Sequence, residues 1–142
     1  MEIWIVRHAD PDYEHDSITE KGVREAGLLA DRLAKQDFDA AYCSPMGRAQ
    51  KTASYTLAKL GMTAQTKKWL REFSGTVNDP ERTNCWDRKP DYWTRIDDYY
   101  DSEKWLSVDL MKNGDVERHY REVCNGVDEL LAEHGYVKNG RI

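Results

Sequence analysis

The chain has 142 residues, 39% of them hydrophobic, and a net charge of −5 at pH 7. This composition indicates one folded domain with a modest apolar core, and it disfavours disorder and nucleic-acid binding. No run approaches the roughly 18 apolar residues of a membrane span. The N-terminus lacks the basic and apolar regions of a secretory signal, and the three cysteines form no CxxC pair. We therefore expect a cytoplasmic protein with reduced thiols and no membrane contact.

The chain opens with a strand signal followed by a helix signal. Ile3–Val6 is a short apolar run that predicts a buried strand. Ser17 to Glu20 carries the S-x-x-E signature of a helix start, with Thr19 as a competing cap. The helix is expected to run to about Lys35. Its apolar face has helical spacing and consists of Val23, Ala26, Ala30 and Leu33.

The same order repeats in the next segment. Ala40–Cys43 is a second strand candidate, and Ser44 and Pro45 are expected to cap and open a helix that ends at Gly61. Thr63–Thr66 is a weak third strand candidate. Strands that alternate with helices predict an α/β fold with a parallel sheet.

Residues 76–105 differ in character from the rest of the chain. They hold six of its fifteen aromatic residues, together with eight acids and five bases, a net charge of −3. We expect an insertion built of short helices. It could cover a functional site, or it could be a surface subdomain held together by its aromatic rings.

Arg7 and His8 directly follow the first strand candidate, Ile3–Val6. Ligands of parallel sheets bind at the carboxyl ends of the strands. A guanidinium there can hold a phosphate or carboxylate with two hydrogen bonds, and a neutral imidazole can attack an electrophile or transfer a proton. Taken alone, the pair also fits an ordinary polar strand end.

Two further motifs follow the other strand candidates. Residues 44–53 read S-P-M-G-R-A-Q-K-T-A and place Arg48 in the first turn of a helix, where backbone N–H groups also attract anions. Residues 69–75 read W-L-R-E-F-S-G and offer Glu72 as a general acid, with Arg71 beside it. Taken alone, each motif also fits a capped helix or solvated surface charge.

In this order, R-H-A, S-P-M-x-R-A-x-x-T-A and L-R-E-F-x-G resemble the motifs of the histidine phosphatase superfamily. The resemblance extends to I-T-E-K-G at residues 18–22 and R-E-A at residues 24–26, the usual start of its first helix. It implies a three-layer α/β fold of the phosphoglycerate mutase type with a mostly parallel sheet. Residues 1–142 would then form a single domain that carries the insertion.

The resemblance also implies roles for individual residues. His8 is the nucleophile that becomes phosphohistidine, Glu72 is the general acid, and Arg7 and Arg48 clamp the phosphate. A loop hydroxyl can add a phosphate contact, from Thr19 or Ser17, although helix capping alone accounts for both. The partner is a small phosphorylated metabolite, with no metal ion and no cofactor.

These roles carry physical requirements. One ring nitrogen of His8 must be unprotonated to attack phosphorus, so we expect the other to donate to a backbone carbonyl, which fixes the tautomer. Glu72 must hold a proton near neutral pH, and burial beside the phosphate would raise its pKa.

One part of the family pattern is not matched. The family uses a second histidine after a later apolar strand, whereas His134 follows residues 116–133, whose spacing predicts an amphipathic helix that stops at Gly135. We therefore expect a C-terminally truncated domain that lacks this strand and its histidine. The first strand would then have an open edge, through which the chain could form a homo-oligomer.

Three alternatives stay open. The motifs do not separate a phosphatase from a mutase, although the net charge of the insertion disfavours a highly anionic bisphosphate. A catalytically impaired module could bind phosphate without turnover. A metal-dependent hydrolase is the third alternative, because one loop gathers hard ligands. These are His8, Asp10, Asp12, His15 and Asp16.

Overall fold

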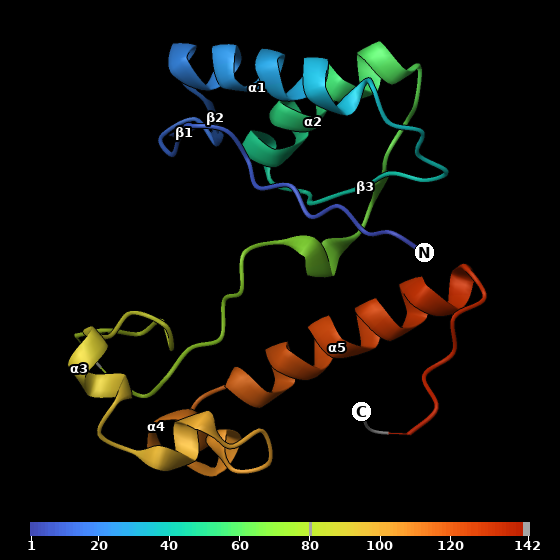
Figure 1. The fold of residues 1–142 in the computed structure, drawn as a ribbon. Coiled ribbons are helices and arrows are strands. Elements are labelled where there is room, and N and C mark those ends of the chain that lie inside the picture. The colour runs from blue at the N-terminus through green and yellow to red at the C-terminus, as the bar shows by residue number, and fades with distance from the viewer. Residues whose placement is uncertain (80, 141–142) are drawn as a thin grey trace. The chain divides into compact units, whose positions relative to one another are not determined.

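The computed structural model describes residues 1–79 and 81–140, so Pro80 of the insertion lies outside the described residues. The chain folds as two compact units, Met1–Arg71 and Glu72–Ile142 (Figure 1). Two such units can belong to one domain, so the single domain stays a prediction. Within the described residues, no helix combines the length and the apolar character needed to cross a membrane.

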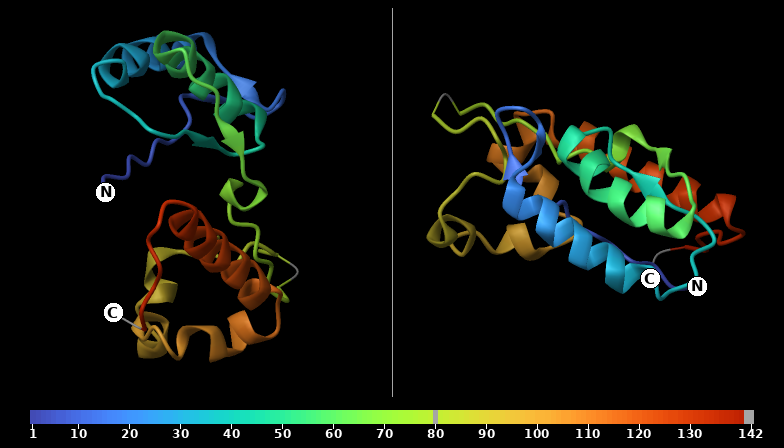
Figure 2. Two further views of the ribbon diagram at one scale, coloured as in Figure 1. Left: turned by 90° about the vertical axis from the view of Figure 1, so that its right-hand side faces the viewer. Right: turned by 90° about the horizontal axis from the view of Figure 1, so that it is seen from above.

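The first unit combines two helices with two small sheets (Figure 2). An antiparallel pair places Pro11 opposite Ile18, and a parallel pair places Tyr42 opposite Gln65. The parallel pairing confirms the predicted type of sheet, although each strand has only two residues. The elements are β1 (Pro11–Asp12), β2 (Ser17–Ile18), α1 (Glu20–Leu33), β3 (Tyr42–Cys43), α2 (Gly47–Leu60), β4 (Gln65–Thr66) and the 3-10 turn η1 (Lys68–Leu70).

Helix α1 is capped by Thr19, the competing candidate, and not by Ser17. The Thr19 hydroxyl accepts a hydrogen bond from the Gly22 N–H at 3.1 Å, which satisfies one of the N–H groups that a helix start leaves unpaired. Along the predicted apolar face Ala26, Ala30 and Leu33 are buried, whereas Val23 is 38% exposed. Most of this face therefore packs inward, and α1 contacts α2.

Helix α2 begins later than predicted. Ser44 and Pro45 do not open the helix, because Met46 holds the cap position and Gly47 is the first helical residue. The Ser44 hydroxyl accepts a hydrogen bond from the Met46 N–H at 3.2 Å, so it stabilises the turn before the helix. The C-terminal end is as expected, since Gly61 adopts the left-handed conformation with a φ of 64°.

The prediction of a buried strand at Ile3–Val6 is wrong. Ile3 is 62% exposed and Ile5 is 94% exposed, and the segment is not a strand in the structure. An apolar run becomes a strand only where a neighbouring strand pairs with its backbone. Here the candidate neighbours, β3 and β4, pair with each other. Within the described residues no strand pairs with Ile3–Val6, so association with another chain there stays a prediction.

The second unit is built from short helices and one long helix. Its elements are α3 (Pro90–Trp93), η2 (Asp97–Tyr100), η3 (Trp105–Ser107), α4 (Asp109–Lys112) and α5 (Val116–Glu133). The buried core consists of Val77, Cys85, Met111 and Val116. Trp93, Tyr99 and Trp105 pack against this core. The ring centroids of Trp93 and Tyr99 are 5.2 Å apart, and Tyr120 adds an edge contact to Trp105 at 5.0 Å. This packing agrees with an aromatic-held subdomain.

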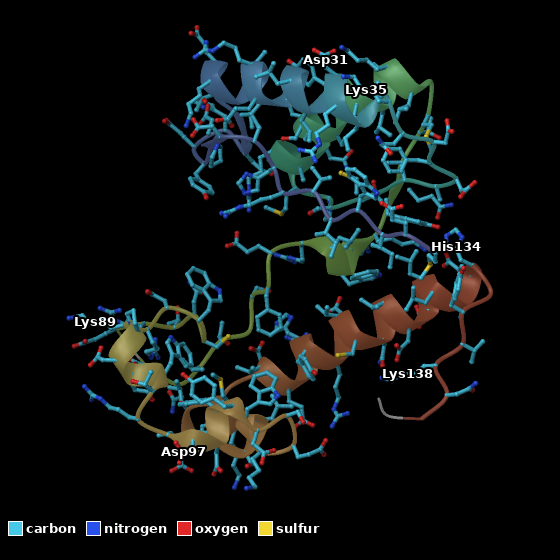
Figure 3. All side chains as sticks on the ribbon, viewed as in Figure 1. Asp31, Lys35, Lys89, Asp97, His134 and Lys138 are labelled. Atoms are coloured by element: carbon cyan, nitrogen blue, oxygen red, sulfur yellow. The ribbon has the colours of Figure 1, made fainter. Side chains whose placement is uncertain are left out.

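Helix α5 confirms the predicted long helix. It ends with His134 in the C-cap position, followed by Gly135 with a φ of 81°. His134 is exposed at the helix end and follows no strand (Figure 3). Its context therefore differs from that of the second catalytic histidine expected from the resemblance.

Candidate active site

His8 lies half-buried in the segment just before β1. Its Nδ1 is 2.8 Å from the carbonyl oxygen of Ala9. Because a carbonyl oxygen can only accept, this hydrogen bond requires the proton on Nδ1. In the neutral imidazole the lone pair is then on Nε2. The expected backbone partner that selects the tautomer of His8 is therefore present.

Thr52 connects the backbone beside His8 to α2. Its hydroxyl accepts a hydrogen bond from the Ala9 N–H at 3.0 Å and donates to the Arg48 carbonyl oxygen at 2.7 Å. Thr52 is only 4% exposed, so both hydrogen bonds are shielded from water. The backbone next to His8 is thus attached to the helix that carries Arg48. The sequence analysis did not single out Thr52, although it is the threonine of the R-A-x-x-T-A motif.

Arg48 is buried in the first turn of α2, where it contacts a carboxylate of the same unit. Its Nη1 donates to Asp16 Oδ1 at 2.8 Å, and the Gly47 N–H donates to Asp16 Oδ2 at 2.6 Å. The N–H of Gly47, followed by the contacts of Arg48, lowers the pKa of Asp16. The ring of Tyr13 lies 5.4 Å from the Arg48 guanidinium carbon. The position expected for a bound anion therefore holds Asp16, which the sequence analysis considered only as a metal ligand.

Thr19 and its neighbours form a separate polar cluster. The Thr19 hydroxyl donates to Asp10 Oδ2 at 2.6 Å, and Lys21 Nζ donates to Asp10 Oδ1 at 3.2 Å. These contacts lower the pKa of Asp10 and raise that of Lys21. The single hydroxyl proton of Thr19 is donated to Asp10, and its oxygen caps α1, so these two hydrogen bonds explain a threonine at this position. Its contact with a phosphate stays a prediction.

The residues of the metal alternative bind different partners. Asp12 contacts His15 at 2.8 Å, Asp10 contacts Thr19 and Lys21, and Asp16 contacts the start of α2. Over the described residues, no three His, Cys, Asp or Glu side chains form a group suited to a metal ion. The three cysteines are free thiols, and burial raises the pKa of Cys43 and Cys85.

Glu72 and Arg7 are the exposed members of the predicted site. Glu72 follows η1 and Arg71 and is the first residue of the second unit. Its side chain is exposed, so the burial expected for a general acid is not observed. Arg7 is exposed in the first unit. The catalytic role of Glu72 and the phosphate-binding roles of Arg7 and Arg48 stay predictions.

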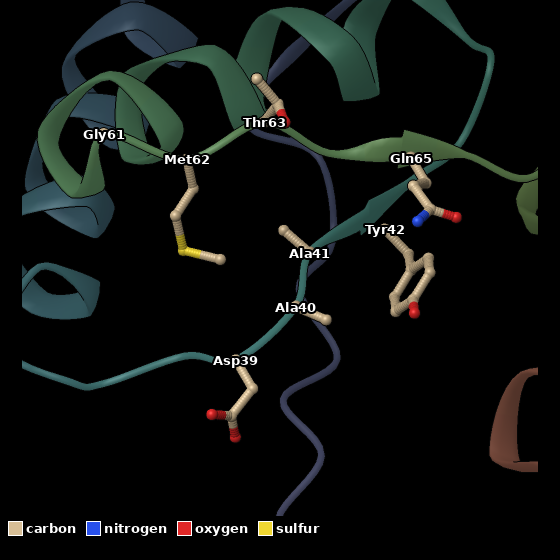
Figure 4. A pocket seen from close by; sticks show the side chains of 8 residues that line it. All are labelled: Asp39, Ala40, Ala41, Tyr42, Gly61, Met62, Thr63 and Gln65. Carbon is tan, nitrogen blue, oxygen red and sulfur yellow. The ribbon is translucent and has the colours of Figure 1, made fainter. Parts of the chain in front are cut away.

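An open cavity of about 390 Å³ lies at the end of the parallel pair where β3 and β4 begin. It is lined by residues that precede β3, among them Asp39 and Ala40, and by residues that precede β4, among them Gly61 and Met62 (Figure 4). Arg48, which is in the same unit, comes after the carboxyl end of β3. The cavity is therefore separate from the candidate active site.

Comparison with known proteins places this arrangement in a family. The model of the histidine phosphatase superfamily (branch 1) matches residues 3–136. The chain therefore belongs to the histidine phosphatase superfamily. Its small sheets and flanking helices are consistent with the phosphoglycerate mutase-like α/β fold expected from the motifs.

Two curated relatives are similar over part of the chain. They are the probable phosphoglycerate mutases GpmB of Yersinia pestis (strain Pestoides F) and of Yersinia pseudotuberculosis serotype O:1b (strain IP 31758). Each is 31% identical over 83 residues, covering 52% of this chain and 39% of the relative. The match thus spans well under half of each relative. No solved structure matches the chain.

Proposed function

We propose that this protein hydrolyses a small phosphomonoester through a phosphohistidine on His8. The observation that carries the proposal is the hydrogen bond from Nδ1 of His8 to the Ala9 carbonyl oxygen, 2.8 Å long, which favours Nε2 as the nucleophile. Membership of the histidine phosphatase superfamily supports the same reaction class. The hydrogen bond from the Ala9 N–H to Thr52 attaches the backbone next to His8 to the helix that carries Arg48, which supports a common site for the nucleophile and the phosphate.

The proposed reaction has two steps. In the first, His8 Nε2 attacks phosphorus, the ester P–O bond breaks, and the leaving alkoxide takes a proton from Glu72. In the second, water attacks phosphorus, the P–N bond breaks, and Glu72 regains a proton from that water. Arg7 and Arg48 stabilise the charge on the equatorial phosphate oxygens during both steps.

A mutase is the second candidate, because the curated relatives are named probable phosphoglycerate mutases. A mutase would transfer the phosphoryl group from His8 to a hydroxyl of a second substrate instead of water. We favour hydrolysis of a small phosphorylated metabolite, since the insertion at residues 76–105 carries a net charge of −3. A module that binds phosphate without turnover is the third candidate.

The test is turnover of p-nitrophenyl phosphate by the wild-type chain and by His8→Ala. His15→Ala is the matched control, since His15 lies in the turn between β1 and β2 of the same unit, is exposed and pairs with Asp12. We expect His8→Ala to lower kcat/KM on the order of 10³-fold or more, because it removes the nucleophile. His15→Ala should retain activity. Wild-type protein quenched during turnover should carry an acid-labile phosphoryl group that His8→Ala lacks.

The outcomes separate the candidates. Unchanged activity in His8→Ala would contradict the proposal. Transfer of the phosphoryl group to phosphoglycerate in preference to water would identify the mutase. A chain that binds inorganic phosphate but neither turns over nor becomes phosphorylated would identify the binding module. Loss of activity with a chelator would favour the metal-dependent alternative.

A further inference from the structure

We propose that Asp16 is a positioning residue for Arg48, and that it belongs permanently to the start of α2 instead of giving way to the substrate. The inference rests on the proposed function, in which Arg48 binds the phosphate. Asp16 touches no reacting atom in this scheme. It acts by holding the arginine side chain in one orientation before the substrate arrives.

The contacts of Asp16 fix both the helix start and the arginine. Oδ2 accepts from the Gly47 N–H at 2.6 Å, and Oδ1 accepts from Arg48 Nη1 at 2.8 Å. A weaker contact joins Oδ1 to the Arg48 N–H at 3.4 Å. Met46, in the cap position, makes no side-chain cap hydrogen bond. The carboxylate of Asp16 therefore supplies the cap from a distant loop.

Two backbone features show that this contact is built into the fold. Asp16 has a φ of 43°, a left-handed conformation that is strained for most residues and tolerated by Asp, Asn and Gly. A Cβ added at Gly47 would lie 2.1 Å from the Asp16 carbonyl oxygen, so only glycine permits this approach. The loop and helix thus meet at a distance that a side chain on residue 47 would prevent.

The arrangement changes where a phosphate is expected to bind. The sequence predicts that an anion accepts hydrogen bonds from the backbone N–H groups in the first turn of the helix and from Arg48. In the structure the carboxylate holds the Gly47 N–H and one N–H of the guanidinium. We therefore place the phosphate beside the guanidinium and not at the Gly47 N–H, which Asp16 keeps. A fixed arginine loses less conformational entropy on binding than a mobile one.

The test uses Asp16→Asn and Asp16→Gly, with Asp12→Asn as the matched control. Asn and Gly both tolerate the positive φ, so neither adds backbone strain. Asn keeps an oxygen that can accept from the Gly47 N–H but loses the charge that Arg48 contacts, and Gly removes both. Asp12 ends β1, just before the turn that holds Asp16, and contacts His15. The readouts are kcat and KM for p-nitrophenyl phosphate, the inhibition constant of inorganic phosphate, and thermal unfolding.

We expect Asp16→Gly to lower kcat/KM roughly 10- to 100-fold and to weaken phosphate inhibition by a similar factor, because Arg48 loses its fixed orientation. Asp16→Asn should show a smaller loss of the same kind, and Asp12→Asn should stay within about 2-fold. Folded variants whose kcat/KM and phosphate inhibition match the wild type would overturn the proposal. Tighter phosphate inhibition would overturn it as well, because Asp16 would then compete with the substrate.

Calorimetric titration with inorganic phosphate separates this proposal from the proposed function. If the wild-type chain has no turnover and forms no phosphohistidine, the proposed function fails. The role of Asp16 is then read from phosphate binding, which Asp16→Gly should weaken and Asp12→Asn should preserve. A wild-type chain that binds no phosphate would overturn both proposals.

Discussion

The two units of the chain differ in what fills their interiors. The first unit buries apolar side chains of α1, and helix α2 adds a row of buried polar or charged side chains one turn apart, Arg48, Thr52 and Thr56. In the second unit, the core is apolar and surrounded by aromatic rings. Its buried residues are Val77, Cys85, Met111 and Val116.

Buried polar groups and buried apolar side chains specify a structure in different ways. Buried polar groups must find partners with defined geometry, so Arg48 and Thr52 fix the positions of Asp16 and Ala9. Apolar side chains need only volume and shape, so an aromatic-rich core sets the fold without directing a reactive group. We therefore expect activity to depend on the buried polar contacts of Arg48 and Thr52, and the stability of the second unit to depend on its apolar core.

The largest expected effect on stability comes from Met111→Ala. Met111 is 5% exposed in the core of the second unit, and truncation leaves a cavity that destabilises by about 2–5 kcal/mol. Leu28→Ala is the control, because Leu28 is 72% exposed and should change stability by less than about 0.5 kcal/mol. Hydrogen exchange read by mass spectrometry should rise mainly in residues 72–142. An equal rise throughout residues 1–71 would contradict the comparison.

Gly47→Ala should have the next largest effect. The added methyl group would meet the Asp16 carbonyl oxygen at 2.1 Å, and overpacking of this kind costs about 1–3 kcal/mol. Gly27→Ala is the matched control, since no atom lies within 4 Å of its added Cβ and alanine favours a helix. Urea titration should show Gly47→Ala less stable and Gly27→Ala slightly more stable than wild type. Equal midpoints for both variants would contradict the close approach of loop and helix.

Thr52→Val tests the hydrogen bonds between Ala9 and α2. Valine keeps the shape but leaves the Ala9 N–H without its acceptor, which costs about 1–3 kcal/mol. We also expect a roughly 10-fold loss of kcat/KM, because His8 is adjacent to Ala9. Thr52→Ser should restore most of the activity, and Thr56→Val, one turn further along α2, should lower activity little. Retained activity in Thr52→Val would show that His8 does not depend on this link.

The smallest expected effect is the pH dependence contributed by Asp115 in the second unit. Hydrogen bonds from the Thr76 N–H and hydroxyl and from Arg118, with the nearby charge of His119, lower the pKa of Asp115 to about 2, from an ordinary value of 3.8. A lowered pKa contributes stability above pH 4 and loses it as the pH falls towards 2. Because Asp115 is partly exposed, the contribution is at most about 1 kcal/mol.

Asp115→Asn should therefore flatten the fall in unfolding free energy between pH 4 and pH 2. Asp109→Asn, at the exposed start of α4, is the control and should keep the wild-type slope. The measurement is a series of urea titrations across this pH range. A wild-type slope in Asp115→Asn would show that Asp115 has the same pKa in the folded and unfolded chain.

Local patterns predicted the helices better than the strands. Ala26, Ala30 and Leu33 recur at helical spacing and are buried in α1, and α5 ends at the predicted glycine. Helices form hydrogen bonds within one segment, so a short stretch of sequence holds most of the information. Ile3–Val6 has strand composition but is exposed, because a strand needs partners from elsewhere in the chain.

The sequence by itself determined the family: the motifs that contain His8, Arg48 and Glu72 identified it, because these residue types in this order are specific to it. Only the tertiary structure decided how the residues of the first unit are held. Asp16 caps α2 from 31 positions away, and Thr52 reaches Ala9 across 43 positions. Such contacts form only where the folded backbone brings distant segments together. A pattern of neighbouring residues in the sequence cannot predict them.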